Sequence, residues 1–471
     1  MLALIILHIF FVSFTDKPEK SAPALSPRAI EQRARWHIPT DGMDYPVSPM
    51  YQSELRKMGV KIHHVSRWFN GATCEMDSTT ALKVKDLSFV TDVEITREDA
   101  VPQPPEARRR VHKWNHELVD DPIVDDPLVN ATEEQLALYN LHPLHEAGYK
   151  GKGILMTVCD GGFGNANTLD CLSSKALGTF DFTDDKTDFF DAGTGLHGTA
   201  CLSTIVGAKE DYNGAATDVQ YYLMRSEEHD TESPKEMDNL VAALEKADSL
   251  GVNIFSVSLG YSWFDNTDWT LPKSALDGKT TRASRAATIA ARKGMLVCPA
   301  AGNDGNKEWQ TISVPADADS IITGGAVGLD SIAAAFSSFG PSADGRIKPE
   351  VCAVGQGTAL LNTAGEIIHS NGTSFATPLI AGLAACLWSA YPKENAMQIR
   401  ERIIRSADRF DHPDYGQYGF GIPDAWKAYN MQLTGISQLS SEISHQKVLR
   451  NGHVVIVREG RIYDILGRRI E

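Results

Sequence analysis

Four polar residues of this chain have the types that nucleophilic catalysis requires: Asp160, His197, Asn303 and Ser374. A serine hydroxyl is a poor nucleophile at its own pKa, so it needs a neighbouring base, and the base needs a carboxylate that orients it. Asp160, His197 and Ser374 supply this set. The side-chain amide of Asn303 could donate to an oxygen that becomes negatively charged during the reaction.

The stretch that carries Ser374 predicts a buried helix. Residues 370–391 read SNGTSFATPLIAGLAACLWSAY, in which a turn-forming start is followed by a long apolar run. We predict a helix of about four turns with Ser374 at its N-terminus and Pro378 in its first turn, where a missing N–H costs little. A hydroxyl there lies beside unpaired backbone N–H groups and the positive end of the helix dipole. The alternative is that Ser374 only caps the helix.

The other candidate residues lie at the ends of predicted strands or at the start of a helix. The segments are GILMTVCD at 153–160, GLHGTACLSTIVG at 195–207, VNIFSVS at 252–258 and MLVCPAAGNDG at 295–305. From Tyr139 onward such strands alternate with helical segments, one of them announced by a capping box at Ser233–Glu236. This alternation indicates an α/β fold with a parallel sheet and helices on both faces. Because open sheets bind ligands at the carboxyl ends of their strands, Asp160, Ser258 and Asn303 are expected at one edge.

Taken together, these segments resemble the signatures of the subtilisin-like serine peptidases. The chain order Asp, His, Ser matches that family's arrangement, and NGTSFATP at 371–378 is the most specific segment. Further similar segments are SVSLGYS at 256–262, FSSFGPSADGRIKPEV at 336–351 and YGFGIPDAWKA at 418–428. The resemblance spans roughly 145–430.

The resemblance implies a role for each candidate residue. Ser374 would attack a peptide carbonyl, His197 would take and return the proton, and Asp160 would hold the imidazole. Asn303 and the N–H of Ser374 would bind the oxyanion. The substrate-binding residues would be Ser258, Leu259, Gly260, Ala300, Ala301 and Gly302, whose backbone would pair with an extended peptide. No cofactor is needed for this chemistry.

Alternatives remain for single residues and for the whole chain. Asp160 could cap a loop, His197 could be a hydrogen-bonded core histidine, and Asn303 could hold a turn. Ala200 and Phe375 depart from residues frequent in the family, which affects the local pocket shape rather than the chemistry. A catalytically silent subtilisin fold that serves as a binding module is the rival function. A serine esterase is disfavoured by the triad order and by the lack of a G-x-S-x-G motif.

Composition narrows the class of protein. With 471 residues, 42% of them hydrophobic, and 38 glycines, the chain is long enough for two or three globular domains. A net charge of −16 argues against binding nucleic acid. The seven cysteines are expected to be buried free thiols, with metal ligation or thiol catalysis near Cys159 and Cys201 as the alternative.

The N-terminal third predicts a leader and a small domain. Met1–Phe14 is almost wholly apolar, which favours a signal peptide and a secreted or cell-surface protein, with an N-terminal core segment as the alternative. Residues 47–97 predict the order helix, strand, strand, helix, strand. This order resembles the family's propeptide, a folding aid and inhibitor; an unrelated substrate-binding domain is the alternative. The predicted domains are 1–15 (signal), 16–110 (propeptide with linker), 111–430 (peptidase) and 431–471 (tail).

The sequence also predicts roles for three further segments. The boundary at 101–133 is proline-rich, then basic at Arg108–Arg110, and thus suited to proteolytic cutting. Residues 445–471 alternate like short strands and resemble the sorting signal of type IX secretion, which would make export machinery a partner; an extra hairpin of the catalytic domain is the alternative. The loop aspartates are Asp181, Asp184, Asp185, Asp188 and Asp191, for which a structural calcium ion or a solvated acidic loop are the two interpretations.

Overall fold

The computed structural model describes residues 6–18, 21–98, 131–184, 186–229 and 231–433, together with the backbone of three strands in the tail. The chain divides into two compact units, Met1–Asn430 and Met431–Glu471.

The peptidase domain is built on a five-stranded parallel sheet with the order β11-β10-β5-β9-β6. The strands are β5 (Leu155–Asp160), β6 (Ala176–Asp181), β9 (Gln220–Arg225), β10 (Ile254–Val257) and β11 (Leu296–Pro299). Asp160 is the last residue of the central strand β5, and Ser258 directly follows β10. The predicted meeting of strand ends at one edge of the sheet is therefore confirmed.

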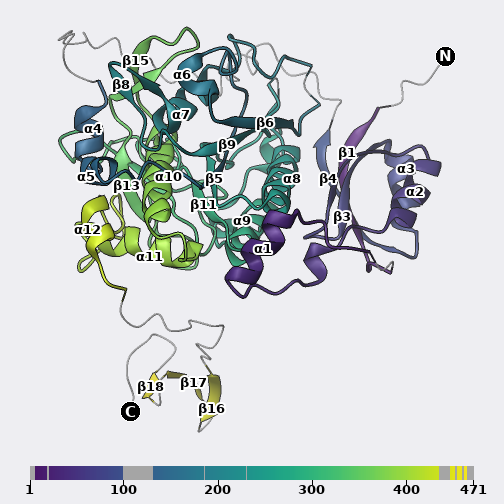
Figure 1. Cartoon of the computed structure of the whole chain (residues 1–471). Helices are drawn as coiled ribbons and strands as arrows, with labels where there is room; N and C mark the ends of the chain where they lie inside the picture. The colour runs from purple at the N-terminus through teal and green to yellow at the C-terminus, as the bar shows by residue number, and fades with distance from the viewer. Residues whose placement is uncertain are drawn as a thin grey trace. The chain divides into compact units, whose positions relative to one another are not determined.

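Side chains of the strands alternate between two hydrophobic cores. In β5, Met156 and Val158 belong to the core under α7 (Leu196–Val206) and α10 (Thr373–Ala390). Leu155 and Cys159 belong to the opposite core. That core lies under the helices α8 (Lys235–Leu250) and α9 (Arg282–Arg292). Figure 1 shows these helix pairs on the two sides of the sheet, so the predicted α/β architecture is confirmed.

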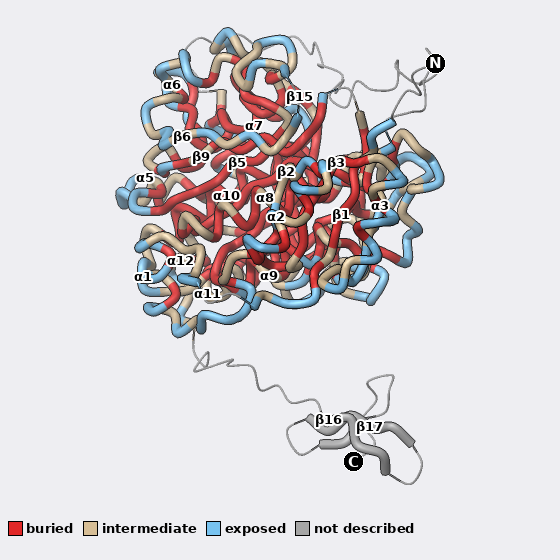
Figure 2. The backbone as a smooth tube through the Cα atoms, turned by 90° about the vertical axis from the view of Figure 1, so that its right-hand side faces the viewer, coloured by how far each residue is buried: buried red, intermediate tan, exposed pale blue. Residues whose placement is uncertain are grey.

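Helix α10 passes through the middle of the larger core. All residues from Thr373 to Trp388 are buried (Figure 2), so this helix, although apolar and long enough to cross a membrane, is a core helix. Pro378 is not in its first turn as predicted. The helix begins at Thr373, which puts Pro378 in the second turn and removes one hydrogen bond from the helix interior.

Smaller elements surround this framework. They are α4 (Glu133–Ala137), α5 (His142–Glu146), α6 (Asp170–Ser173), α11 (Ala396–Ser406), α12 (Ala425–Asn430), β7 (Ala208–Lys209), β8 (Tyr212–Asn213), β12 (Gly324–Val327), β13 (Val351–Val354), β14 (Thr358–Leu361) and β15 (Ile367–Ser370). Helix α8 begins one residue later than its capping box predicts, because Pro234 is the N-cap; the N–H of Ser233 still donates to Glu236 at 3.2 Å.

The N-terminal domain is a four-stranded antiparallel sheet with the order β2-β3-β1-β4. Its elements are β1 (His8–Phe14), α1 (Pro27–Arg35), α2 (Pro49–Lys57), β2 (Lys61–Ser66), β3 (Gly71–Met76), α3 (Ser78–Lys85) and β4 (Val90–Glu98). The predicted order of elements in residues 47–97 is confirmed. Strand β1, however, lies in the centre of the sheet, between β3 and β4.

This position corrects the assignment of residues 8–14. Phe10, Val12 and Phe14 pack in the core beneath α2 and α3. Phe11, from the other face, lies 4.3 Å from the guanidinium of Arg282 on α9. A strand covered on both faces reads as a continuous apolar run, which is also the pattern of a signal peptide. For His8–Phe14 the alternative, a core segment, is what the structure contains, and the predicted boundary at residue 15 falls inside the domain.

The N-terminal domain contacts the peptidase domain through buried hydrogen bonds to helix α8. The Glu245 carboxylate accepts from the Ser66 hydroxyl at 2.5 Å and from the backbone N–H groups of Arg67 and Trp68 at 2.9 and 3.2 Å. The Arg67 guanidinium also donates to Asp248 at 2.6 Å. Because these groups are buried, each carboxylate depends on the donors of the N-terminal domain for compensation.

A second group of buried charges extends the same interface. Arg33, on helix α1, ion-pairs with Asp44 at 2.5 Å and with Asp248 at 2.7 Å. Lys293 of the peptidase domain reaches Asp44 at 3.0 Å. Burial opposes the ionisation of Asp44, but the hydrogen bonds from Arg33 and Lys293 outweigh it and lower the pKa of this carboxyl. Charges of both domains therefore stabilise one another.

The tail forms a small antiparallel sheet of its own. Its strands are β16 (Gln446–Arg450), β17 (His453–Arg458) and β18 (Arg461–Tyr463), in the order β16-β17-β18. The sequence places turn signals at the two connections, Asn451-Gly452 and Glu459-Gly460. The short alternating strands that the sequence predicts are therefore confirmed.

Candidate active site

Asp160 and His197 form a buried hydrogen-bonded pair. The Nδ1 atom of His197 lies 2.8 and 3.0 Å from the two carboxylate oxygens of Asp160, and both side chains are buried. Gly198 permits this approach, because a Cβ there would lie 2.1 Å from the carbonyl oxygen of Gly162 and 3.0 Å from the Cβ of Asp160. Since Nδ1 faces a carboxylate, it carries the proton, and Nε2 is the basic nitrogen.

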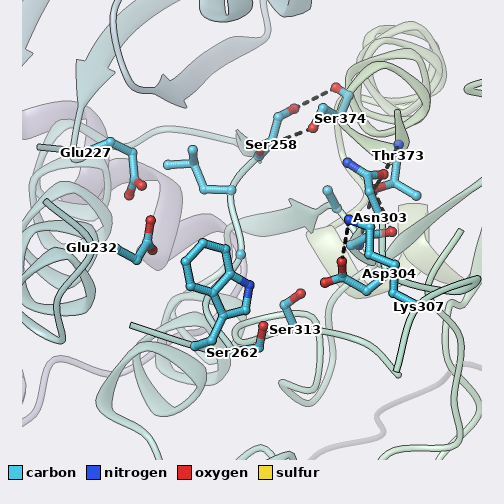
Figure 3. Close-up of a pocket in the computed structure, with 15 residues that line it drawn as sticks. Glu227, Glu232, Ser258, Ser262, Asn303, Asp304, Lys307, Ser313, Thr373 and Ser374 are labelled. Atoms are coloured by element: carbon cyan, nitrogen blue, oxygen red, sulfur yellow. Dashed lines mark hydrogen bonds and ion pairs between the residues drawn. The ribbon is translucent and has the colours of Figure 1, made fainter. Parts of the chain in front are cut away.

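Ser374 lies at the second position of α10, close to that pair. The thiol of Cys201 contacts both His197 and Ser374. Its Sγ atom is 3.8 Å from His197 Nδ1 and 3.4 Å from the carbonyl oxygen of Ser374. The rings of His197 and Phe375 are 5.7 Å apart. The hydroxyl of Ser374 donates to the carbonyl oxygen of Ser258 at 3.3 Å (Figure 3). The structure thus gathers the acid, base and nucleophile types at one sheet edge.

Asn303 is oriented by the N-terminus of α10. Its Oδ1 atom accepts from the backbone N–H of Thr373 at 2.9 Å and faces the Thr373 hydroxyl at 3.0 Å. An oxygen is required opposite the backbone N–H, which fixes the amide orientation and leaves the Nδ2 donors on the other side. In Figure 3 that side faces Ser374. This arrangement places an amide N–H and a helix N-terminus around one point.

A pocket with a volume of about 190 Å³ lies beside these groups. It is lined by Glu227, Glu232, Ser258, Leu259, Gly260, Ser262, Trp263, Ala300, Gly302, Asn303, Asp304, Lys307, Ser313, Thr373 and Ser374 (Figure 3). Five of the six predicted substrate-binding residues are present. Ala301 is not: it is fully buried, its N–H donates to Gly324 at 3.0 Å, and its carbonyl accepts from Ser313 at 3.0 Å.

Glycines keep the backbone of the pocket open, because there is no room for a side chain at two of its positions. A Cβ on Gly302, whose φ is +114°, would lie 2.7 Å from the Ser313 hydroxyl oxygen, and a Cβ on Gly260 would lie 2.8 Å from the Ser313 Cβ. The backbone of these two glycines is therefore open to a ligand because side chains are lacking. A peptide with an extended backbone could enter between them.

Cys201 is a thiol rather than a thiolate. Burial, reinforced by the nearby Asp160 charge, raises the pKa of its thiol well above the ordinary value. A metal ligand or a thiol nucleophile has to be deprotonated. The sequence alternative of thiol or metal chemistry is therefore disfavoured at Cys201. Burial also raises the pKa of Cys159. All seven cysteines are free, as predicted.

Two acidic residues line the pocket that sequence reasoning did not single out. Glu227 and Glu232 are buried, and with Glu236 they bring three carboxylates within 4.8 Å of one another. The Tyr261 hydroxyl donates to Glu227 at 2.5 Å. Thr373 is a further functional residue that the sequence did not single out. Its position directly before Ser374 in the NGTS segment is the signal that could have indicated it. No sequence pattern indicates the two glutamates, because both lie in the loop between β9 and α8, where no helical or strand periodicity marks which side chains turn inward.

The described loop aspartates are engaged within the protein. Asp181 pairs with Arg225, and Asp184 binds Lys235 at 2.7 Å and His63 at 2.8 Å. Asp188 and Asp191 accept from backbone N–H groups of their own loop, and Asp185 lies outside the described residues. Among the described residues, no group of three metal-ligand side chains includes them.

This chain is similar to known proteins of one family. The pattern of the subtilase family, Peptidase S8, matches residues 151–421, and the Bacteroidota Peptidase S8 propeptide domain matches residues 9–112. Subtilisin DY of Bacillus licheniformis is 31% identical over 283 residues, which cover 58% of this chain and 90% of that protein. A thermostable alkaline protease of Halalkalibacterium halodurans is 27% identical, with 62% of this chain and 72% of that protein covered.

Solved structures agree at the level of the fold. The crystal structure of MycP1 from Mycobacterium smegmatis aligns with a TM-score of 0.52 at 20% identity and covers 64% of this chain and 85% of its own. The propeptide match begins at residue 9, within strand β1, as the position of that strand in the N-terminal sheet requires. The chain therefore belongs to the subtilase family, and it is a subtilisin-like serine endopeptidase with its own propeptide domain.

Proposed function

We propose that this enzyme cleaves peptide bonds with Ser374 as nucleophile, His197 as general base and Asp160 as the residue that orients the base. The observation that carries the proposal is the buried Asp160–His197 pair, 2.8 Å apart, beside a serine at a helix N-terminus. The Ser374 hydroxyl would turn from the carbonyl of Ser258 towards His197 Nε2 when a peptide enters. His197 would then return the proton to the leaving amine.

The oxyanion of the tetrahedral intermediate would be stabilised by Asn303 and by the N–H of Ser374. Asn303 is suited to this because Thr373 engages its Oδ1 atom, so its NH₂ group is held in place before the reaction. The backbone of Leu259 and Gly260 on one side and of Gly302 on the other would pair with the substrate as an added strand. Substrates are therefore extended protein segments.

Labelling with a fluorophosphonate tests the nucleophile and the base. We expect the reagent to modify Ser374 alone, as measured by mass spectrometry of the digested protein. His197→Ala should lower the labelling rate by roughly 10⁴-fold or more, because the hydroxyl then has no acceptor for its proton. His412→Ala, a change at an exposed histidine of the peptidase domain, is the control and should leave the rate unchanged.

Two results would contradict the proposal. Undiminished labelling of His197→Ala would remove the base from the mechanism. A parent chain that is folded, freed of its propeptide and still inert to the reagent would favour the silent binding module.

We propose further that the enzyme is secreted and that the tail is a type IX sorting signal. The support is the resemblance of residues 445–471 to such signals and the compact unit that the tail forms apart from Met1–Asn430. A structural calcium ion in the 181–191 loop stays a prediction.

Deletion of residues 445–471 should stop export from the native host while leaving the peptidase folded. The reason is that the peptidase core is complete within the first unit. The measurements are the distribution of the protein between cells and medium and the midpoint of thermal unfolding. A fall of several degrees in that midpoint would instead show that the tail is a hairpin of the catalytic domain.

A further inference from the structure

The carbonyl group of Ser374 lacks its usual partner in helix α10. In an α-helix the carbonyl of residue i accepts from the N–H of residue i+4, and the residue four positions after Ser374 is Pro378. Proline has no N–H, so this carbonyl is left without that bond in the buried first turn of the helix. A buried carbonyl without a partner destabilises the backbone that carries it.

Two side chains from other elements supply the missing hydrogen bonds. The hydroxyl of Ser258 donates to the Ser374 carbonyl oxygen at 2.7 Å, and the thiol of Cys201 donates to the same oxygen at 3.4 Å. Ser258 follows strand β10, and Cys201 lies one turn after His197 on α7. The first turn of α10 is therefore tied both to the sheet and to the helix that carries the base.

Ser258 and Ser374 also bond in the opposite direction. The Ser374 hydroxyl donates to the Ser258 carbonyl, so the two residues exchange a pair of hydrogen bonds (Figure 3). During catalysis the hydroxyl has to leave that carbonyl, whereas the bond from the Ser258 hydroxyl can persist. The side chain of Ser258 can thus hold the backbone of Ser374 in place while the χ1 angle of Ser374 changes.

We propose that Ser258 and Cys201 are positioning residues, whose side chains replace the hydrogen bond that Pro378 removes and so hold the nucleophile in line with its base. The proposal rests on the proposed role of Ser374. Ser258 makes the shorter bond and contributes more, because a thiol is a weak donor. A small displacement of a nucleophile lowers the rate steeply while it leaves substrate binding largely intact.

The test uses Ser258→Ala, Ser258→Thr and Pro378→Ala in chains freed of the propeptide by one added protease. Ser258→Ala should lower kcat by about 10-fold to 100-fold with little change in KM, since the peptide pairs with backbone that the variant keeps. Ser258→Thr keeps the hydroxyl and should recover most of kcat. Adding Pro378→Ala to Ser258→Ala returns an N–H to the Ser374 carbonyl, so kcat should rise again.

The rescue by Pro378→Ala separates positioning from simple packing. If Ser258→Ala only disturbed packing, a new backbone N–H at position 378 of α10 would not repair the defect. The proposal is wrong if Ser258→Ala has the parent's kcat, or if Pro378→Ala leaves the kcat of Ser258→Ala unimproved. Ser389→Ala is the matched control, because this serine of α10 donates to the carbonyl of Cys386 at 2.7 Å, far along the helix, and its loss should not change kcat.

Two further arms keep the test decisive. Should Ser258→Ala not fold, Ser258→Cys keeps the shape with a weaker donor; its kcat should lie below that of Ser258→Thr and should rise when Pro378→Ala is added. Cys201→Ala should lower kcat by about 2-fold to 5-fold, less than Ser258→Ala. A parent that fluorophosphonate does not label at Ser374 would refute the proposed function, whereas a labelled parent with an unaffected Ser258→Ala refutes the positioning role alone.

Discussion

Ser374→Ala is expected to leave the chain at its full length of 471 residues, whereas the parent accumulates a fragment of roughly 35–40 kDa. We expect the enzyme to cut itself within 97–115, because strand β4 of the N-terminal domain, which leads into that segment, ends beside peptidase-domain residues close to the pocket. The last described residues of strand β4 support this: Arg97 lies 3.9 Å from Glu228, and Glu98 lies 3.5 Å from Asn266. Glu227, next to Glu228, lines the pocket that contains Ser374.

The physical reason for self-cleavage is effective concentration. A bond carried by the same chain, and delivered to the pocket by a docked domain, meets the nucleophile far more often than a free substrate does. The buried bonds from Ser66 and Arg67 to Glu245 keep the domain docked while this happens. The same bonds should retain the cleaved domain as a noncovalent inhibitor.

The experiment is gel electrophoresis and N-terminal sequencing of purified parent and Ser374→Ala proteins over time. Purification matters because the basic triplet Arg108–Arg110 could be cut by an external trypsin-like enzyme. Ser389→Ala, on the same helix, should mature like the parent. If purified Ser374→Ala matures at the parent's rate, the prediction of self-processing is wrong, and the catalytically silent binding module gains support.

Asp160→Asn is expected to lower kcat by about 10⁴-fold without unfolding the protein. In the structure one carboxylate oxygen accepts both from the N–H of Gly161, at 2.8 Å, and from His197 Nδ1, and the other oxygen lies 3.0 Å from Nδ1. An asparagine would keep its oxygen on the Gly161 N–H and turn its NH₂ towards His197. Nδ1 would then have to accept, so the proton would move to Nε2, and the imidazole could no longer take a proton from Ser374.

Steady-state hydrolysis of a peptide and the fluorophosphonate labelling rate both measure this loss. Thermal unfolding shows whether the variant is folded, and Asp211→Asn, at an exposed carboxylate that pairs with Lys209, is the control. Combining Asp160→Asn with Ser374→Ala should cause almost no loss beyond Ser374→Ala alone, because the residues act as a unit. A kcat for Asp160→Asn within about 10-fold of the parent's would exclude the orienting role.

Much of the fold follows from local patterns that the sequence carries openly. Apolar runs that end in Asp160, Ser258 and Asn303 read as buried strands, and their carboxyl ends meet at one edge because parallel strands share a direction. The long run after Ser374 is a helix as predicted, since no breaker interrupts it except a proline that its neighbours accommodate. Periodicity and chain order were enough for these elements.

The exceptions arise where burial comes from distant parts of the chain. Strand β1 reads like a signal peptide because helices cover one face and Arg282 approaches the other, so no polar alternation marks it as a strand. Ala301 looks like its neighbours in sequence, yet its backbone bonds to Gly324 and Ser313 remove it from the pocket. Neither fact is encoded within the segment itself.

The sequence by itself determined the chemical groups of the site, their order and the elements that carry them, because side-chain type and local periodicity are properties of short segments. Only the tertiary structure decided how those groups are oriented. Thr373 turns the amide of Asn303, and Asp160 sets the proton of His197. Ser258 and Cys201 bond a carbonyl that Pro378 leaves open. Each of these contacts joins residues far apart in the chain, and hydrogen-bond geometry exists only once the folded core has brought them together.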